Sequence, residues 1–303
     1  MPMTAAQRLI QFNKIAVLTD LERDSEKLLR YAGSLGRWYG SQLLLVHGCS
    51  ADEHVDRREP SPHWPTREPQ LKEEDEKKLW TLSQKFHLQD LVSKVLIRQA
   101  GIGELLRELE ECRPNLIVIA SHGREGVRKW LAGSVCEEVF RTVQWPVLVL
   151  GPCAAEEDPG AQKQFTSILY ATDMSAISVS ALQYAAGIAH DHDAQLTALY
   201  VDEKPEESFS FDRAMALQRL DDWLQDHVDG LAGALGGVRP VVESGKAETA
   251  IVQAAAERRA DLIVLGARGL RGATGLASHF VGGTAYEVVC AAKCPVLIVQ
   301  QPR

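Results

Sequence analysis

The segment LIVIASHG occupies residues 116–123, and LIVLGARG occupies residues 262–269. Each is a continuous apolar run that ends in small and polar residues, which is typical of a strand in a parallel sheet covered on both faces. The flanking sequence repeats too, with KIAVLTD (14–20) matching SILYATD (167–173) and WPVLVL (145–150) matching CPVLIV (294–299). Because Asp20 and Asp173 are 153 positions apart, the repeat indicates a duplicated domain and not a solenoid.

Length and composition fit two soluble domains. The chain has 303 residues, of which 45% are hydrophobic and 24% charged, so each half can bury its own core. We expect one domain over residues 1–152, a linker over 153–164 that contains Pro, Gly and acidic residues, and a second domain over 165–303. The net charge of −8 argues against a nucleic-acid partner.

The lack of a recognisable targeting signal and the spacing of the cysteines predict a cytoplasmic protein. The opening residues lack the apolar core of a secretory signal, and no apolar run is long enough to span a bilayer, so we expect no membrane association. The six cysteines have no framework spacing. Cys290 and Cys294 are interpreted as buried thiols, because a structural zinc site needs four ligands and no second pair is near.

Predicted strands alternate with predicted helices in both halves. The strands are expected at 15–18, 42–46, 92–97, 116–119 and 147–150, and at 168–170, 196–200, 238–242, 262–265 and 296–299. The helices are expected at 22–35, from near 70 past 82, at 103–111, 127–143, 178–190, 213–235, 248–256 and 284–291. This order predicts an α/β fold of two tandem doubly wound, Rossmann-like domains, each with a five-stranded parallel sheet.

Small and acidic residues gather at the predicted carboxyl ends of the first-half strands. Asp20 follows the first strand, Gly48 the second and Gly123 the fourth, and the step Gly133-Ser134 follows them. In open α/β sheets ligands bind at this edge, at the point where the strand order reverses. Glycine allows close approach of the backbone, and helix N-terminal N–H groups suit phosphate oxygens.

On these residues the chain resembles the universal stress protein family, and specifically its tandem, two-domain members. The family's nucleotide-binding motif is Gly, two residues, Gly, nine residues, Gly, then Ser or Thr. Gly123, Gly133 and Ser134 match it, with Ala120 in place of the first Gly. In the second half Gly266 and Gly269 match the opening pair. From there either three residues are inserted before Gly282, or Gly269 and Gly272 form the working pair, with Gly283 standing before Thr284.

The resemblance implies a regulatory protein that binds ATP or a related adenine nucleotide, with or without Mg²⁺. Asp20 and Asp173 would contact the nucleoside, and the backbone at Gly48 and Val201 would border the adenine. The remaining motif residues would hold ribose and phosphates; they are Ala120, Gly123, Gly133, Ser134, Gly266, Gly269, Gly282, Gly283 and Thr284. The regular motif spacing leads us to expect tighter ATP binding in the first half.

Assembly follows from the same resemblance. Family members pair through their last strands, and this chain carries two copies, at 147–150 and 296–299. We therefore expect an intramolecular pseudo-dimer of the two halves, which covers sheet edges. A further homodimer is left open.

The sequence also bears on other classes of function. The alternative from another class is an interaction or dimerisation protein of the same fold that binds no nucleotide. An ATP pyrophosphatase or adenylyltransferase would need a Ser-Gly-Gly-x-Asp-Ser loop or a His-x-Gly-His pair, and the sequence has neither. No Lys stands in a phosphate-binding loop, which argues against fast phosphoryl transfer. We therefore expect no enzyme, with slow ATP hydrolysis left open. The run from His190 to Asp193 is interpreted as an exposed polar turn and not as a metal site.

Overall fold

The computed structural model describes residues 8–19, 21, 24–48, 64–98, 102–120, 143–154, 164–203, 213–228, 237–267 and 283–300. The first half contains β1 (Lys14–Thr19), α1 (Ser25–Tyr39), β2 (Gln42–Gly48), α2 (Trp64–Lys85), β3 (Val92–Arg98), α3 (Ile102–Cys112), β4 (Leu116–Ala120) and β5 (Val147–Leu150). The second half contains β6 (Ser167–Thr172), α5 (Ala176–His192), β7 (Gln195–Asp202), α6 (Arg213–His227), β8 (Val238–Ser244), α7 (Ala247–Glu257), β9 (Leu262–Ala267), α8 (Gly283–Ala291) and β10 (Val296–Gln300).

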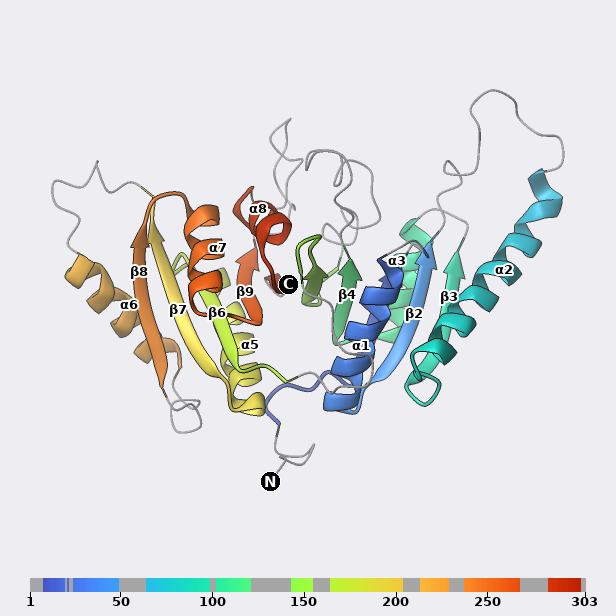
Figure 1. Cartoon of the computed structure of the whole chain (residues 1–303), viewed down its shortest axis with the longest axis horizontal. Helices are drawn as coiled ribbons and strands as arrows, with labels where there is room; N and C mark the ends of the chain where they lie inside the picture. The colour runs from blue at the N-terminus through green and yellow to red at the C-terminus, as the bar shows by residue number, and fades with distance from the viewer. Residues whose placement is uncertain are drawn as a thin grey trace.

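The strands form one ten-stranded sheet in the order β3-β2-β1-β4-β5-β10-β9-β6-β7-β8. Within each half the five strands are parallel, as the sequence predicts. The strand order reverses between β1 and β4, and again between β6 and β9. Figure 1 shows the two halves side by side, with α2 and α6 beside the outermost strands β3 and β8.

Helices cover the sheet on both faces, which explains the continuous apolar strands. One core cluster joins sheet residues to α1, α2, α5 and α6. The other joins them to α3, α7 and α8. In β4 and β5 nearly every residue is buried, so both faces of these strands contribute to a core.

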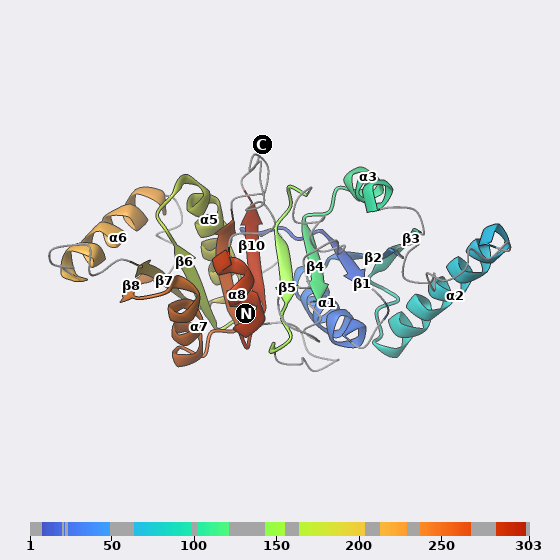
Figure 2. The ribbon, with the colours of Figure 1, turned by 90° about the horizontal axis from the view of Figure 1, so that it is seen from above.

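The halves join through their last strands, and this prediction is confirmed. β5 and β10 pair antiparallel at the centre of the sheet, with Leu148 opposite Leu297 (Figure 2). Both side chains are almost fully buried. The pairing turns two sheet edges into an interior ladder, which removes an aggregation-prone edge from each half.

A buried polar cluster forms a second junction between the halves, and the interpretation of the His190–Asp193 run as an exposed turn is wrong for Asp191 and His192, although Asp193 is exposed. Asp191 and His192 are 3% and 2% exposed. The Asp191 carboxylate accepts hydrogen bonds from the N–H groups of Leu9 and Ile10 at 2.7 and 3.0 Å. The last turn of α5 is buried because the N-terminal segment and α1 cover it, and sequence spacing does not reveal such distant partners.

His192 sits at the centre of this junction. Its Nδ1 accepts a hydrogen bond from the Phe165 N–H at 3.2 Å, and its Nε2 lies 3.0 Å from the Tyr39 hydroxyl. Since Nδ1 accepts, a neutral ring carries its proton on Nε2 and donates it to Tyr39. Burial raises the pKa of the Tyr39 hydroxyl, which therefore stays neutral. Trp38 stacks on the ring with a centroid distance of 4.5 Å.

Two helix boundaries differ most from the sequence prediction. α2 begins at Trp64 and not near Gln70. Pro65 falls in the first turn, where a missing N–H has no helical acceptor to lose, whereas Pro69 lies past the first turn and removes one helical hydrogen bond. α6 ends at His227 and not at Leu235, where the following sequence contains glycines that lower helix propensity. The helix predicted at 127–143 lies almost entirely outside the described residues.

Candidate functional site

A pocket of about 350 Å³ lies at the carboxyl ends of the second-half strands. Its walls come from β6, β7, β9 and the N-terminal parts of α5, α7 and α8. β6 and β9 are the neighbouring strands at which the strand order reverses, and this is where open α/β sheets bind ligands. Four of the predicted residues line the pocket: Asp173, Val201, Gly266 and Thr284.

Asp173 is held by a compact turn between β6 and α5. Its Oδ1 accepts hydrogen bonds from the Ser175 N–H at 3.0 Å and the Ser178 hydroxyl at 2.7 Å. The Met174 N–H donates to the Thr172 hydroxyl oxygen, and Met174 adopts a left-handed φ of 57°. These contacts fix the carboxylate at the rim of the pocket, beside the N-terminus of α5.

Hydrogen bonding keeps Asp173 ionised. Partial burial on its own would raise the pKa of this carboxyl group, but the hydrogen bonds from Ser175 and Ser178 outweigh that effect, and the pKa lies below its ordinary value of 3.8. At neutral pH the pocket therefore presents a negative charge and a hydrogen-bond acceptor at this point. Such a group suits a hydroxyl or an amine of a ligand and repels a phosphate.

The wall along β7 is apolar at Leu199 and Val201 and acidic at Glu203, which directly follows the strand. Leu199, Val201 and Glu203 line the pocket at alternate positions, as the period of two along a strand requires. The Glu203 carboxylate accepts a hydrogen bond at 3.2 Å from the N–H of Ala247, the first residue of α7. Glu203 thereby holds the start of α7, whose Ile251 adds an apolar surface to the pocket.

Gly266 and Gly283 have different steric surroundings. A Cβ on Gly266 would lie 3.2 Å from both the Cγ2 and the carbonyl oxygen of Ile177, so this glycine lets β9 pack closely against α5. Among the residues that the structure describes, none has an atom within 4 Å of a Cβ built on Gly283. Gly283 is exposed at the start of α8, directly before Thr284.

The corresponding turn in the first half repeats part of this geometry. The Leu21 N–H donates to the Thr19 hydroxyl oxygen at 3.1 Å, and Leu21 has a φ of 63°, matching Met174. Gly48 ends β2, and Ala120 ends β4. The other predicted residues lie outside the part of the chain that the structure describes; they are Asp20, Gly123, Gly133, Ser134, Gly269 and Gly282.

Sequence reasoning missed Glu203 and Ser178 as pocket residues. The alternation along β7 gives a signal for Glu203, because it lies two residues after Val201 and on the same face. Ser178 stands in the first turn of α5, where a hydroxyl can reach back to the preceding carboxylate. Within the described residues, no group of three or more His, Cys, Asp or Glu side chains is placed to hold a metal ion.

The helices that the structure describes include none with the length and hydropathy needed to cross a membrane. The model of the universal stress protein family matches twice, over residues 11–151 and 164–300. The two matches correspond to the two halves of the sheet.

Curated relatives match about half of this chain. A universal stress protein of Methanocaldococcus jannaschii, MJ0531, is 31% identical over 147 residues, which are 46% of this chain and 84% of that protein. A Thermus aquaticus universal stress protein, encoded in the 3′ region of the QAH/OAS sulfhydrylase gene, is 37% identical over 142 residues, 45% of this chain and 99% of that protein.

Solved structures match over the whole length. A universal stress protein from Archaeoglobus fulgidus DSM 4304 has a TM-score of 0.72 at 22% identity, covering 96% of this chain and 97% of that chain. A putative universal stress protein from Pseudomonas aeruginosa UCBPP-PA14 has a TM-score of 0.60 at 18% identity, covering 95% and 93%. At these identities the likeness shows the fold. With the two family matches, it follows that the chain belongs to the universal stress protein family and carries two of its domains in tandem.

Proposed function

We propose that this protein binds an adenine nucleotide, ATP or a close relative, at the carboxyl ends of its sheet strands and acts as a regulator. One observation carries the proposal: four predicted residues from four separate segments, Asp173, Val201, Gly266 and Thr284, line a single pocket. Its volume of about 350 Å³ falls in the range of small-molecule sites.

The pocket offers a complementary surface to each part of such a ligand. Val201 and Ile251 provide apolar surface for a base, and the ionised Asp173 can accept a hydrogen bond from a ribose hydroxyl or an exocyclic amine. The N-terminus of α8 at Gly283 offers N–H groups and a partial positive charge to phosphate oxygens. The acidic and the anion-binding surfaces belong to different elements, as a nucleotide requires.

The chemistry of the pocket favours regulation over catalysis. The titratable groups among its described lining residues are the carboxylates of Asp173 and Glu203. A carboxylate whose pKa is lowered is a weak general base, and Glu203 accepts a hydrogen bond from the start of α7. We therefore propose binding that changes the conformation or partners of the protein.

Two measurements test this function. Nucleotide released by denaturing the purified protein is identified by chromatography, and ATP is titrated into wild type, Gly283→Val and Ala291→Val. The new side chain at Gly283 should contact none of the described residues closely but should obstruct phosphates at the start of α8. Ala291 is exposed at the other end of the same helix, so Ala291→Val should bind like wild type.

The expected result is an adenine nucleotide in the extract and loss of one class of site in Gly283→Val alone. Equal binding by Gly283→Val and wild type would remove this pocket from the proposal. Absence of both co-purifying nucleotide and ATP binding would favour the alternative, an interaction protein of the same fold.

A further inference from the structure

A second pocket lies at the amino ends of the first-half strands, whereas the candidate nucleotide pocket lies at carboxyl ends. Its volume is about 680 Å³, and the described residues that line it come from both halves. The first half contributes the segments that lead into β1, β4 and β5, and the second half contributes the middle of α5. Ligand sites occur preferentially at such interfaces between domains, and this volume lies within their usual range.

Contacts between the halves hold the walls of this pocket in place. The N-terminal segment runs between the lower ends of α5 and α1 (Figure 1), and the Ile10 N–H donates to the Asp191 carboxylate at 3.0 Å. Ile10 also packs on α5 at Gly187, where a Cβ would lie 2.6 Å from the Ile10 Cγ1. Ahead of β4, the Asn115 Oδ1 accepts a hydrogen bond from the Lys14 N–H at 3.0 Å. A pocket with walls fixed in this way costs a ligand little ordering.

The lining combines aromatic rings, carboxamides and one charge. The rings of Phe12 and Tyr184 are nearly parallel, with centroids 6.3 Å apart, and Trp145 is half-buried. Four carboxamides line the pocket, from Gln11, Asn115, Gln144 and Gln183. Among the described lining residues, Arg113 carries the one charge, and no carboxylate is present. Such a surface fits a ligand that has both an aromatic ring and a negative charge.

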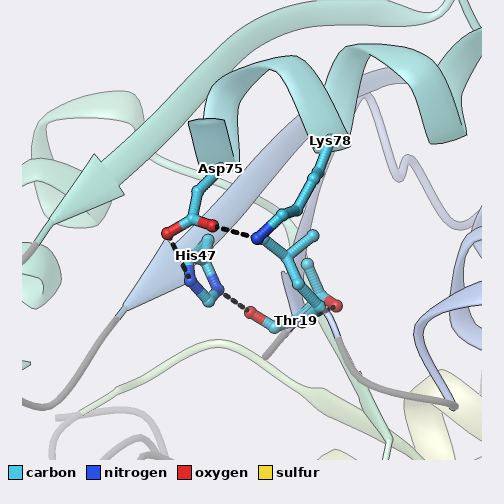
Figure 3. Close-up of polar contacts among 5 residues, drawn as sticks. Thr19, His47, Asp75 and Lys78 are labelled. Carbon is cyan, nitrogen blue, oxygen red and sulfur yellow. Dashed lines mark hydrogen bonds and ion pairs between the residues drawn. The ribbon is translucent and has the colours of Figure 1, made fainter. Parts of the chain in front are cut away.

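Arg113 is available to a ligand because no other described residue pairs with its side chain. It follows α3 with a φ of 49°, and its exposed guanidinium makes no hydrogen bond or ion pair within the described part of the chain. Charges at the other edge of the first half are instead paired within the fold. Figure 3 shows the Lys78 ammonium 3.0 Å from one oxygen of Asp75, whose other oxygen lies 3.5 Å from the His47 ring.

The equivalent region of the second half differs in its chemistry. Arg259 follows α7 with a φ of 48°, so it is the counterpart of the pocket arginine. Two positions further on, Asp261 stands where the first half has Asn115. Cys294 precedes a proline at the position where the first half has Trp145. Both halves therefore keep the arginine, but only the first surrounds it with an aromatic and a neutral side chain at these positions.

We infer that this pocket binds a small organic anion that carries an aromatic ring. The Arg113 guanidinium would pair with the carboxylate or sulfonate of the ligand, and Trp145 and Tyr184 would contact its ring. A ligand there contacts segments of both halves, so its binding should stabilise their junction. This inference goes beyond the proposed nucleotide binding and does not depend on it.

Two fluorescent probes test the inference: anilinonaphthalenesulfonate, and N-phenylnaphthylamine, which has the same rings without the sulfonate. Both are titrated into wild type, Arg113→Asn and the matched control Arg259→Asn. Asparagine tolerates a left-handed φ, so both variants should fold. We expect Arg113→Asn to weaken binding of the sulfonate probe about tenfold, the loss of a hydrogen bond to a charged group. The neutral probe should change by less than about twofold, and Arg259→Asn should bind both probes like wild type.

A second pair of variants changes the charge of the pocket and leaves the arginine in place. Gln183→Glu adds a carboxylate to the α5 wall, and Gln84→Glu adds one at an exposed position of α2. Gln183→Glu should weaken binding of the sulfonate probe alone, and Gln84→Glu should affect neither probe. Excess ATP should not displace the sulfonate probe from wild type, because the two sites lie at different edges of the sheet.

Equal affinity of Arg113→Asn and wild type for the sulfonate probe, or displacement of that probe by ATP, would overturn the inference. Losses in Arg259→Asn or Gln84→Glu as large as those in their partners would show general charge attraction and overturn it too. If Arg113→Asn does not fold, the comparison of Gln183→Glu with Gln84→Glu decides the question, and equal binding by these two would contradict the site. None of these outcomes alters the proposed nucleotide binding, which the ATP titration tests separately.

Discussion

Removing the Asp191 carboxylate should destabilise the junction between the halves. In the folded protein this side chain accepts two backbone N–H groups, from Leu9 at 2.7 Å and Ile10 at 3.0 Å. Hydrogen bonds to a charged group contribute about 1.5–3 kcal/mol each, so the two together set an upper range of about 3–6 kcal/mol. The Leu9 side chain is 45% exposed, and water can replace part of the loss, so we expect about 2–4 kcal/mol for Asp191→Ala.

The assay is urea unfolding followed by circular dichroism, together with amide hydrogen exchange of Leu9 and Ile10. Asp191→Asn keeps one acceptor oxygen and should fall between wild type and Asp191→Ala. Asp226→Ala is the control, because Asp226 is an exposed aspartate of α6 and should change stability by less than about 0.5 kcal/mol. A loss below about 1 kcal/mol in Asp191→Ala, with exchange at Leu9 and Ile10 unchanged, would refute the view that this carboxylate anchors the N-terminal segment.

Three further perturbations test the site and the sheet. Gly266→Ala should lower the free energy of unfolding by about 1–3 kcal/mol, because the new Cβ would lie 3.2 Å from Ile177. The control Gly283→Ala should stay within about 0.5 kcal/mol of wild type. Equal urea midpoints for the two variants would contradict the packing role of Gly266. Asp173→Asn should lower the melting temperature at pH 7 but not at pH 2. A carboxyl group whose folded pKa is lowered stabilises the protein above its unfolded pKa, and this stabilisation is lost as the pH falls through the folded pKa. The same difference in melting temperature between wild type and variant at both pH values would contradict this. Leu297→Ala should lower the free energy of unfolding by about 2–5 kcal/mol, since Leu297 is 1% exposed and lies opposite Leu148 across the junction. A calorimetric scan in which the unfolding temperature of the second half does not change would contradict the pairing of the two last strands as a stabilising contact.

Much of the fold could be predicted because its strands are buried on both faces. Continuous apolar runs such as 116–119 and 147–150 have few alternatives to a strand in a covered parallel sheet. The duplicated last strand also predicted the β5–β10 pairing, because an unpaired copy would leave an edge exposed in each half. The strand prediction depends on local hydrophobicity, whereas the pairing prediction also depends on the resemblance to a family whose members pair through their last strands.

The polar contacts were harder to predict because their partners are distant in sequence. From the sequence alone, Asp191 and His192 are interpreted as part of a polar turn. Their burial depends on residues of the other half, namely Leu9, Ile10 and Tyr39. Local spacing carries no information about such partners.

In the candidate site, the motif residues that the structure describes could be found from the resemblance and the strand ends. Asp173, Val201, Gly266 and Thr284 come from four elements that the topology brings to one edge. Strand alternation could also have predicted Glu203 as a pocket residue, because it lies two residues after Val201. The His47–Asp75 contact could not be predicted, because a proline-containing segment separates β2 from α2 and the register between them is a tertiary property.

The most direct test of nucleotide binding at the carboxyl ends of the strands is a calorimetric titration of ATP into wild type, Gly133→Val, Gly283→Val and the double variant. We predict two classes of site in wild type, with loss of the tighter class in Gly133→Val, of the weaker class in Gly283→Val and of both in the double variant. Each lost hydrogen bond to a phosphate should cost about 1.5–3 kcal/mol, roughly tenfold or more in affinity. Binding by the double variant as tight as that of wild type, or no heat of binding in wild type, would contradict the account.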